Sequence, residues 1–113
     1  MAELHPLPTY TVRVHRLDPT LAELRIEFDG LPADVEVRGR LMGPRCPGIS
    51  TIEVAYYLRQ ERGSSSVFGV RIPEPVCWSA ERRCVYEGPV EFWRQGQRIG
   101  SLIVSVGIRE AST

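Results

Sequence analysis

The sequence predicts an all-β domain built as an antiparallel two-sheet sandwich, and two observations support this prediction. Apolar and polar residues alternate with a period of two along most of the chain, which places every second side chain on one face of a strand. Segments rich in Gly, Pro, Asp and Ser interrupt the alternation at short intervals, as turns between strands do. No segment keeps the spacing of an amphipathic helix over successive turns.

Alternating segments begin close to the N-terminus. They lie at 10–15, 23–29, 34–38 and 51–58. In the second of them, Leu24, Ile26 and Phe28 alternate with charged residues, which is the pattern of a strand with one face on the core and one in water. Breaks that contain Pro or Gly separate the segments at 18–20, 29–32 and 43–48.

The second half of the chain continues this pattern. Gly63 and three serines end the segment at 51–58, and Gln95-Gly96 separates 90–93 from a last alternating segment at 102–108. A tight hairpin needs a residue that tolerates positive φ, which Gly96 supplies. About seven short strands at this spacing are typical of a sandwich rather than an α/β fold. We therefore predict one domain over 1–113, an immunoglobulin-like antiparallel two-sheet β-sandwich of about seven strands.

Composition and charge narrow the function classes. Hydrophobic residues make up 42% and charged residues 25% of 113 residues, which are ordinary globular values. The net charge is zero, so no basic excess favours nucleic acid or an anionic membrane. No apolar run reaches the ~20 residues of a membrane span, and the first residues lack the features of a signal peptide. We expect a cytoplasmic protein with no nucleic-acid or membrane partner.

The cysteines are Cys46, Cys77 and Cys84, without CxxC spacing. In a cytoplasmic protein such residues are expected to be reduced and mostly buried. A disulfide between Cys77 and Cys84 is the alternative, because these two flank a short connection. A zinc site would need His5 or His15 as a further ligand at no known spacing, so we expect no metal.

A motif near the C-terminus resembles a known family. Residues 75–86 read PVCWSAERRCVY, and a strand, the turn at Gly96 and Val106-Gly107-Ile108-Arg109 follow. This stretch resembles the immunoglobulin-like domain of glycoside hydrolase family 2 enzymes (the β-galactosidase, β-glucuronidase and β-mannosidase group), with its pattern P-x-x-x-W-S-P-E-x-P-x-L-Y and a final F-G-[IF]-R. The matching residues are Trp78, Ser79, Glu81, Tyr86, Gly107 and Arg109, whereas Ala80 and Arg83 replace two prolines of the pattern.

The resemblance covers about the last third of the chain and implies a scaffold without chemistry, because that family's catalytic carboxylates lie in a separate barrel domain. The residues themselves lead to a similar expectation. Trp78 offers a large ring to close one end of a sandwich. Tyr86 opens a strand after a bend, where a tyrosine corner ties its hydroxyl to upstream backbone. Glu81 is expected to cap or pair locally, beside Arg82 and Arg83.

Catalytic candidates are weak. Two carboxylates across a cleft would be needed for glycoside hydrolysis, but the alternation places the available glutamates mostly on solvent-facing positions. These are Glu53, Glu74, Glu81, Glu87 and Glu91. His5 lies in a Pro-flanked tail and His15 on a polar strand face. We expect no catalytic residue and no cofactor.

The candidate interaction surface consists of Tyr57 and Trp93, which fall on the faces opposite the apolar residues of their strands. Aromatic side chains are enriched in protein interfaces, and sugar-binding modules stack such rings on sugars. Alternatively, Trp93 packs under a loop or on the second face of the sandwich. The leading hypothesis is a non-catalytic module that acts through a protein partner or forms a homo-oligomer. The alternative is a carbohydrate-binding accessory module related to a glycosidase.

Overall fold

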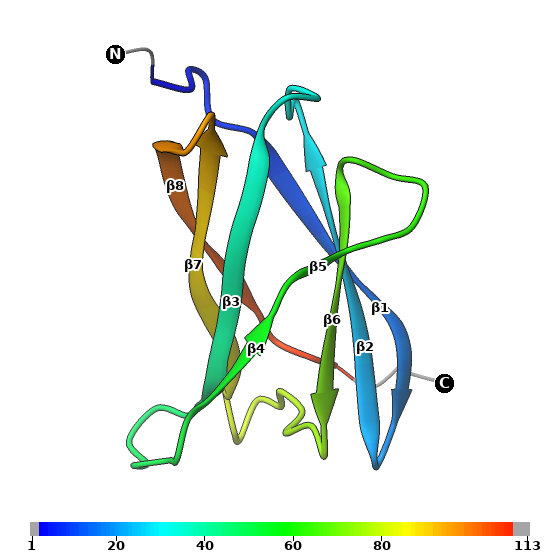
Figure 1. Ribbon diagram of the computed structural model, residues 1–113. Coiled ribbons are helices and arrows are strands. Elements are labelled where there is room, and N and C mark those ends of the chain that lie inside the picture. Colours follow the sequence, from blue (N-terminus) through cyan, green and yellow to red (C-terminus); the bar gives the residue numbers. More distant parts are fainter. Residues whose placement is uncertain (1–2, 110–113) are drawn as a thin grey trace.

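The prediction of an all-β, antiparallel two-sheet sandwich is confirmed by the computed structural model, which describes residues 3–109. Two sheets of four strands pack face to face (Figure 1). The strands are β1 (Thr9–Asp18), β2 (Leu21–Asp29), β3 (Glu36–Arg45), β4 (Val54–Tyr57), β5 (Arg59–Gln60), β6 (Val67–Pro73), β7 (Val85–Arg94) and β8 (Gln97–Val106). Within this part of the chain no helix is long and apolar enough to cross a membrane.

The strand order is that of an immunoglobulin-like sandwich. Sheet A has the order β1-β2-β6-β5, and sheet B has the order β4-β3-β7-β8. Immunoglobulin domains place the first, second, fourth and fifth strands of their basic set in one sheet, and variable types extend the other sheet beside the third strand, where β4 lies here. The alternating segment at 51–58 leaves sheet B after Tyr57, and the chain continues as β5 in sheet A, so the sandwich has eight strands.

The core fills the space between the sheets. The ring of Phe28 on β2 contacts Phe68 of its own sheet and Phe92 of sheet B, with centroid distances of 5.7 Å in both cases. These edge-to-face contacts join the two sheets. Buried aliphatic side chains from both sheets surround them: Leu24, Ile26, Leu41, Val70, Ile72, Val90 and Val104.

The centre of sheet B contains a proline, which is unusual for a strand with neighbours on both sides. Pro89 lies in the middle of β7, between β3 and β8. The pairing of β7 with β3 is interrupted there, between the pairs Gly39–Val90 and Met42–Glu87, because a proline has no N–H to donate. The two strands also come very close beside Pro89, since a Cβ added at Gly88 would collide with the carbonyl oxygen of Arg40.

This close approach predicts that Gly88→Ala is destabilising. Because the atom in the way belongs to the backbone of β3, the strands must separate to admit a methyl group, and we expect the free energy of unfolding to fall by about 1–3 kcal/mol. Urea denaturation measures this loss. Ser101→Ala, at an exposed position of β8, is the control and should change the stability by less than about 0.5 kcal/mol. Equal stability of the two variants would contradict the close approach.

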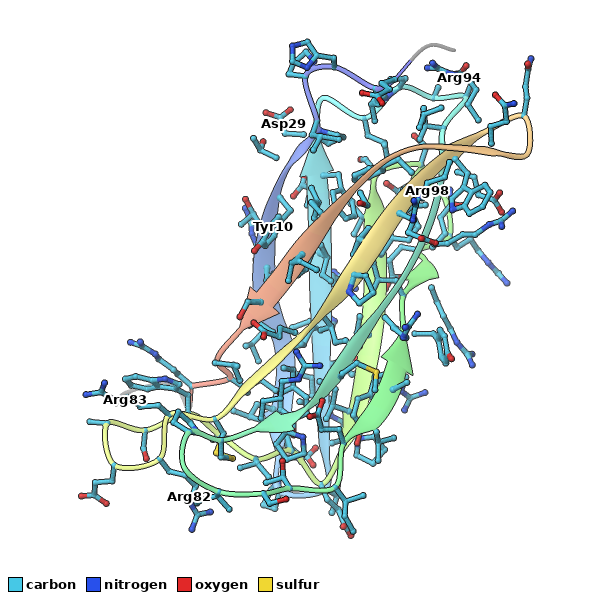
Figure 2. The ribbon with its side chains drawn as sticks, turned by 90° about the vertical axis from the view of Figure 1, so that its left-hand side faces the viewer. Tyr10, Asp29, Arg82, Arg83, Arg94 and Arg98 are labelled. Atoms are coloured by element: carbon cyan, nitrogen blue, oxygen red, sulfur yellow. A yellow bond between two sulfur atoms is a disulfide. The ribbon has the colours of Figure 1, made fainter. Side chains whose placement is uncertain are left out.

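The free edge of β8 is covered by the segment that precedes β1 and by β1 itself. The amide of Leu4 donates a hydrogen bond to the carbonyl oxygen of Ile99 at 2.8 Å, and the Leu7 side chain lies against Gly100. Further along, the Ser105 amide donates to the hydroxyl of Tyr10 at 3.3 Å. Tyr10 lies on β1 (Figure 2). Edge strands expose backbone groups that pair with other chains, so these contacts protect β8 at both ends.

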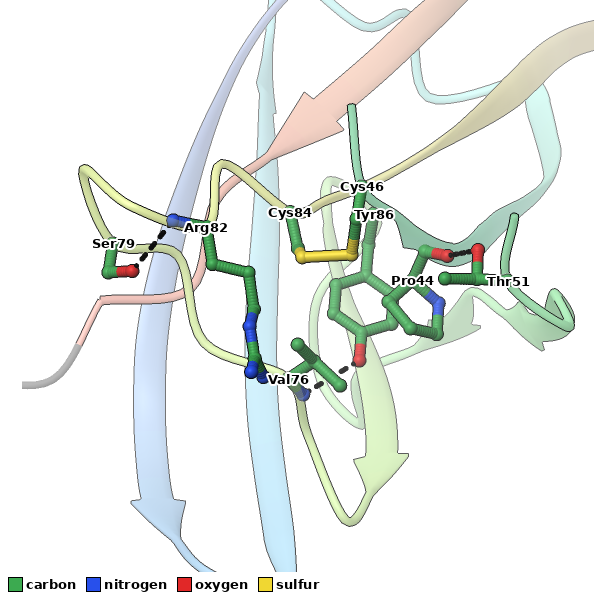
Figure 3. The surroundings of a disulfide bond; sticks show 8 residues. All are labelled: Pro44, Cys46, Thr51, Val76, Ser79, Arg82, Cys84 and Tyr86. Atoms are coloured by element: carbon green, nitrogen blue, oxygen red, sulfur yellow. Dashed lines mark hydrogen bonds between the residues drawn. A yellow bond between two sulfur atoms is a disulfide. The ribbon is translucent and has the colours of Figure 1, made fainter. Parts of the chain in front are cut away.

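The expectation that Cys46 and Cys84 are reduced is wrong, and so is the alternative pairing of Cys77 with Cys84. A disulfide joins Cys46 to Cys84 (Figure 3), and Cys77 is partly buried against the core. Cys46 follows β3 and Cys84 precedes β7, next to the paired residues Arg45 and Val85. The bond therefore connects neighbouring strands of one sheet, unlike the inter-sheet disulfide of antibody domains. The sequence does not reveal it because it depends on the pairing of β3 with β7, and the two cysteines are 38 residues apart.

Candidate functional site

The outer face of sheet B carries a transverse row of side chains that we call the sheet B row: Tyr57, Arg40, Pro89 and Ile103. Tyr57 is paired with Arg40, and Pro89 is paired with Ile103. The register of β3 against β7 places Arg40 beside Pro89. Tyr57 is 64% exposed and Ile103 61% exposed. The row therefore presents an apolar group on each outer strand of the sheet, with a guanidinium between them.

Trp93 lies on the same outer face but apart from Tyr57. Trp93 is paired with Glu36, whereas Tyr57 is paired with Arg40. These two partners are ~13 Å apart along β3, at about 3.3 Å per residue. The structure thus brings the two predicted residues to one face without contact between them.

The ring of Trp93 is half-buried in a charged network. The guanidinium of Arg38 covers it, 4.3 Å from its centroid, and the indole N–H donates to Glu91 at 3.4 Å. Arg38 also binds Glu36 at 3.0 Å, and Arg98 binds Glu91 at 3.1 Å. One face of the indole is therefore already occupied by a cation. Sequence reasoning could not find this cover, because Arg38 lies on another strand.

Most other charges on this face are paired. Arg45 donates to Glu53 at 2.7 Å and to Glu87 at 3.0 Å, and these hydrogen bonds raise the pKa of Arg45. Two of the glutamates considered as catalytic candidates are thus held by one arginine, and Glu91 is held by Arg98. Arg40 differs, because no carboxylate within residues 3–109 pairs with it.

The outer face of sheet A is also charged. Its β2 positions are Glu23, Arg25 and Glu27, and Arg71 on β6 lies 3.8 Å from Glu23. In the strand register, Arg25 stands opposite Arg13 of β1. A solvated surface has this character, so the exposed apolar side chains make sheet B the distinctive face.

The residues singled out by the family resemblance meet at one end of the sandwich. A Cβ added at Gly107 would lie 3.0–3.1 Å from atoms of Trp78, so the indole packs directly on the glycine. The amide of Trp78 donates to the carbonyl oxygen of Ile108 at 2.7 Å. The guanidinium of Arg109 covers the ring, 4.1 Å from its centroid. Trp78 remains partly exposed.

Tyr86 makes the contact predicted for it. The Tyr86 hydroxyl accepts a hydrogen bond from the amide of Val76 at 3.0 Å (Figure 3). Its ring is 1% exposed and packs against Gly43 and the ring of Tyr56. Burial raises the pKa of the Tyr86 hydroxyl, since the charged form loses its hydration.

Glu81 does not hold the turn that contains it. The Ser79 hydroxyl accepts a hydrogen bond from the amide of Arg82 at 3.0 Å, and Glu81 is exposed. His5 is exposed ahead of β1, and His15 is exposed at an irregularity in the pairing of β1 with β2. Within residues 3–109 no group of His, Cys, Asp and Glu side chains is arranged to hold a metal ion.

Comparison with known proteins returned no match to a protein-family model, to a curated protein or to a solved structure. What the chain does must therefore be inferred from its own residues.

Proposed function

We propose that this chain is a non-catalytic β-sandwich module that acts through protein–protein contact or self-association, with the outer face of sheet B as the contact surface. The observation that carries the proposal is the contrast between the two outer faces. Both outer faces carry charged side chains, but only the outer face of sheet B combines its charges with Tyr57 and Ile103, both more than 60% exposed.

The chemistry of the sheet B row supports this assignment. Interfaces are enriched in Tyr, Trp and Arg, and their energy is concentrated in a few such residues. Arg40 lies between the two apolar groups and has no carboxylate partner among the described residues. The neighbouring charges are already paired, so a partner would not leave them uncompensated when it excludes water.

The strand edges give less support for self-association. In sheet B the edge of β8 is covered at both ends and the other edge strand, β4, has four residues. In sheet A the edge strand β5 has two residues, whereas β1 is a longer edge strand that carries the charged residues Arg13 and Arg16. Short edge strands and covered edges reduce pairing between chains. We therefore assign the contact to the face of sheet B rather than to an edge.

Substitution of the sheet B row tests the proposal. We expect Tyr57→Ser with Ile103→Ser to weaken partner binding or self-association at least about tenfold, as loss of interface anchors does. Sedimentation equilibrium measures self-association, and affinity capture from the source lysate compares the two proteins as baits. Thr11→Ala, exposed on sheet A, is the control. A strict monomer whose captured proteins are the same for wild type and double variant would contradict the proposal.

The second candidate is a carbohydrate-binding module related to a glycosidase. The open ring of Tyr57 favours it, because sugars stack on exposed aromatic faces, whereas the ring of Trp93 is covered on one side by Arg38. The relationship to glycoside hydrolase family 2 domains rests on the motif resemblance alone, two residues of which, Trp78 and Gly107, lie in contact. A glycan array separates the candidates: sugar binding that is lost in Tyr57→Ser but kept in Ile103→Ser would favour the carbohydrate module.

The disulfide bears on the cellular compartment of the protein. The expectation of a cytoplasmic location rests on the lack of signal-peptide features and of a long apolar run, but the Cys46–Cys84 disulfide is atypical of that compartment, where thiols are kept reduced. We infer that the module works where disulfides persist. Non-reducing peptide mapping of the protein from its source should recover the linked Cys46 and Cys84 peptides.

A further inference from the structure

We infer that an open cleft at one end of the sandwich binds an extended peptide segment that carries a carboxylate. This cleft, which we call the base cleft, has a volume of about 1120 Å³ and lies between the second half of β1, the segment 75–82 and Arg109. It is separate from the sheet B row. Its lining includes Val14, Leu17, Ile49, Val76, Arg82 and Arg109.

The acidic residues of the base cleft do not occupy all of its guanidinium groups, so some can bind a carboxylate of a ligand. Asp18 is already engaged: one carboxylate oxygen binds Arg16 at 3.2 Å, and the other accepts hydrogen bonds from the hydroxyl and amide of Thr20 and the amide of Leu21. The hydrogen bonds from Thr20 lower the pKa of Asp18, so it stays ionised and bound to its own turn.

Arg82 and Arg109 have no such partner. No carboxylate within residues 3–109 pairs with either guanidinium. The side chain of Arg82 reaches back toward Val76, another residue of the cleft lining (Figure 3). Arginine donors bind carboxylates in a bidentate manner. The one other acidic residue of the described lining is Glu81, so the cleft keeps a basic excess for a negatively charged group.

The shape and walls of the base cleft favour a peptide over a small molecule. It is open rather than enclosed, whereas small-molecule sites surround most of the surface of their ligand. Val14 is 40% exposed and Ile49 59% exposed, which gives the cleft an apolar wall. β1 is an edge strand of sheet A, and an extended peptide can pair with the backbone of such an edge.

The contact between Arg109 and Trp78 allows peptide binding to be followed by tryptophan fluorescence. The guanidinium of Arg109 covers the indole at 4.1 Å. A carboxylate that draws Arg109 into the base cleft changes the surroundings of the ring, so binding should alter the fluorescence of Trp78. The other tryptophan, Trp93, lies outside the base cleft, where its ring contacts Arg38. Replacing Trp93 by Phe therefore isolates the fluorescence of Trp78.

The experiment uses an array of short synthetic peptides with alternating apolar and Asp residues, and matched peptides with Asn in place of Asp. We expect wild type to bind Asp peptides at least about tenfold more tightly than their Asn counterparts. Arg82→Ala with Arg109→Ala should remove that preference, whereas Arg62→Ala, an exposed arginine outside the cleft, should keep it. Thermal unfolding confirms that the variants are folded.

Three outcomes of the peptide measurements would overturn the inference. They are no Asp peptide bound by wild type, equal binding of Asp and Asn peptides, and unchanged binding by the double arginine variant. Inorganic phosphate or acetate that binds the cleft as tightly as the best peptide would also overturn it, by showing a small-anion site. The Tyr57→Ser, Ile103→Ser variant should bind Asp peptides like wild type, so failure of the sheet B proposal and failure of this inference are distinguishable.

Discussion

Tyr86→Ala should lower the free energy of unfolding by about 3–5 kcal/mol, as removal of large buried aromatic side chains does. The ring is 1% exposed, fills the space above Gly43 and packs against Tyr56. Alanine would leave a cavity and would also remove the acceptor of the Val76 amide. Urea denaturation at neutral pH measures the loss. A loss below about 1 kcal/mol would show that the ring does not anchor the core.

Tyr86→Phe separates the hydroxyl from the ring. The variant keeps the packing but leaves the Val76 N–H without its acceptor, which should cost about 1–2 kcal/mol. In the folded protein, burial raises the pKa of the Tyr86 hydroxyl above its reference value of 10.0. The contribution of the neutral hydroxyl to the free energy of unfolding is therefore fully present below pH 10.0 and is lost as the pH rises through the folded-state pKa. Wild type should therefore lose stability above about pH 10 more steeply than Tyr86→Phe.

Reduction of the Cys46–Cys84 disulfide should lower the free energy of unfolding by about 4 kcal/mol. A cross-link restricts the unfolded chain, and for a loop of 38 residues the chain-entropy relation gives about 4 kcal/mol. Paired urea denaturations with and without reductant measure the difference. Cys46→Ser with Cys84→Ser should be destabilised by a similar amount and should not respond to reductant. A reductant effect below about 1 kcal/mol would mean that the bond does not constrain the unfolded chain.

The fold was largely predictable because alternation is a local property of a half-buried strand. Leu24, Ile26 and Phe28 lie in the core as their spacing predicts. The strand β6 was not identified, although Phe68, Val70 and Ile72 also alternate. The short passage from β4 to β5 was not predictable either, because the alternation at 51–58 continues through the point where the chain changes sheets.

The candidate sites were predictable only in part, because they depend on which strands are neighbours. The alternation placed Tyr57 and Trp93 on outer faces, and both belong to sheet B. The pairing that puts Arg40 beside Tyr57, or Arg38 over Trp93, joins distant parts of the chain. The same reason hides the disulfide and the base cleft, whose walls come from β1, the segment 75–82 and Arg109.

The contacts of Leu4 and Leu7 with β8 have a practical consequence for anyone who trims the protein. A fragment that starts at β1 would lack the hydrogen bond to Ile99 and the side chain that lies on Gly100. The uncovered half of β8 would then offer a template to the same strand of another molecule. Shortened versions of this domain are accordingly expected to precipitate or form fibres in storage more readily than the longer chain.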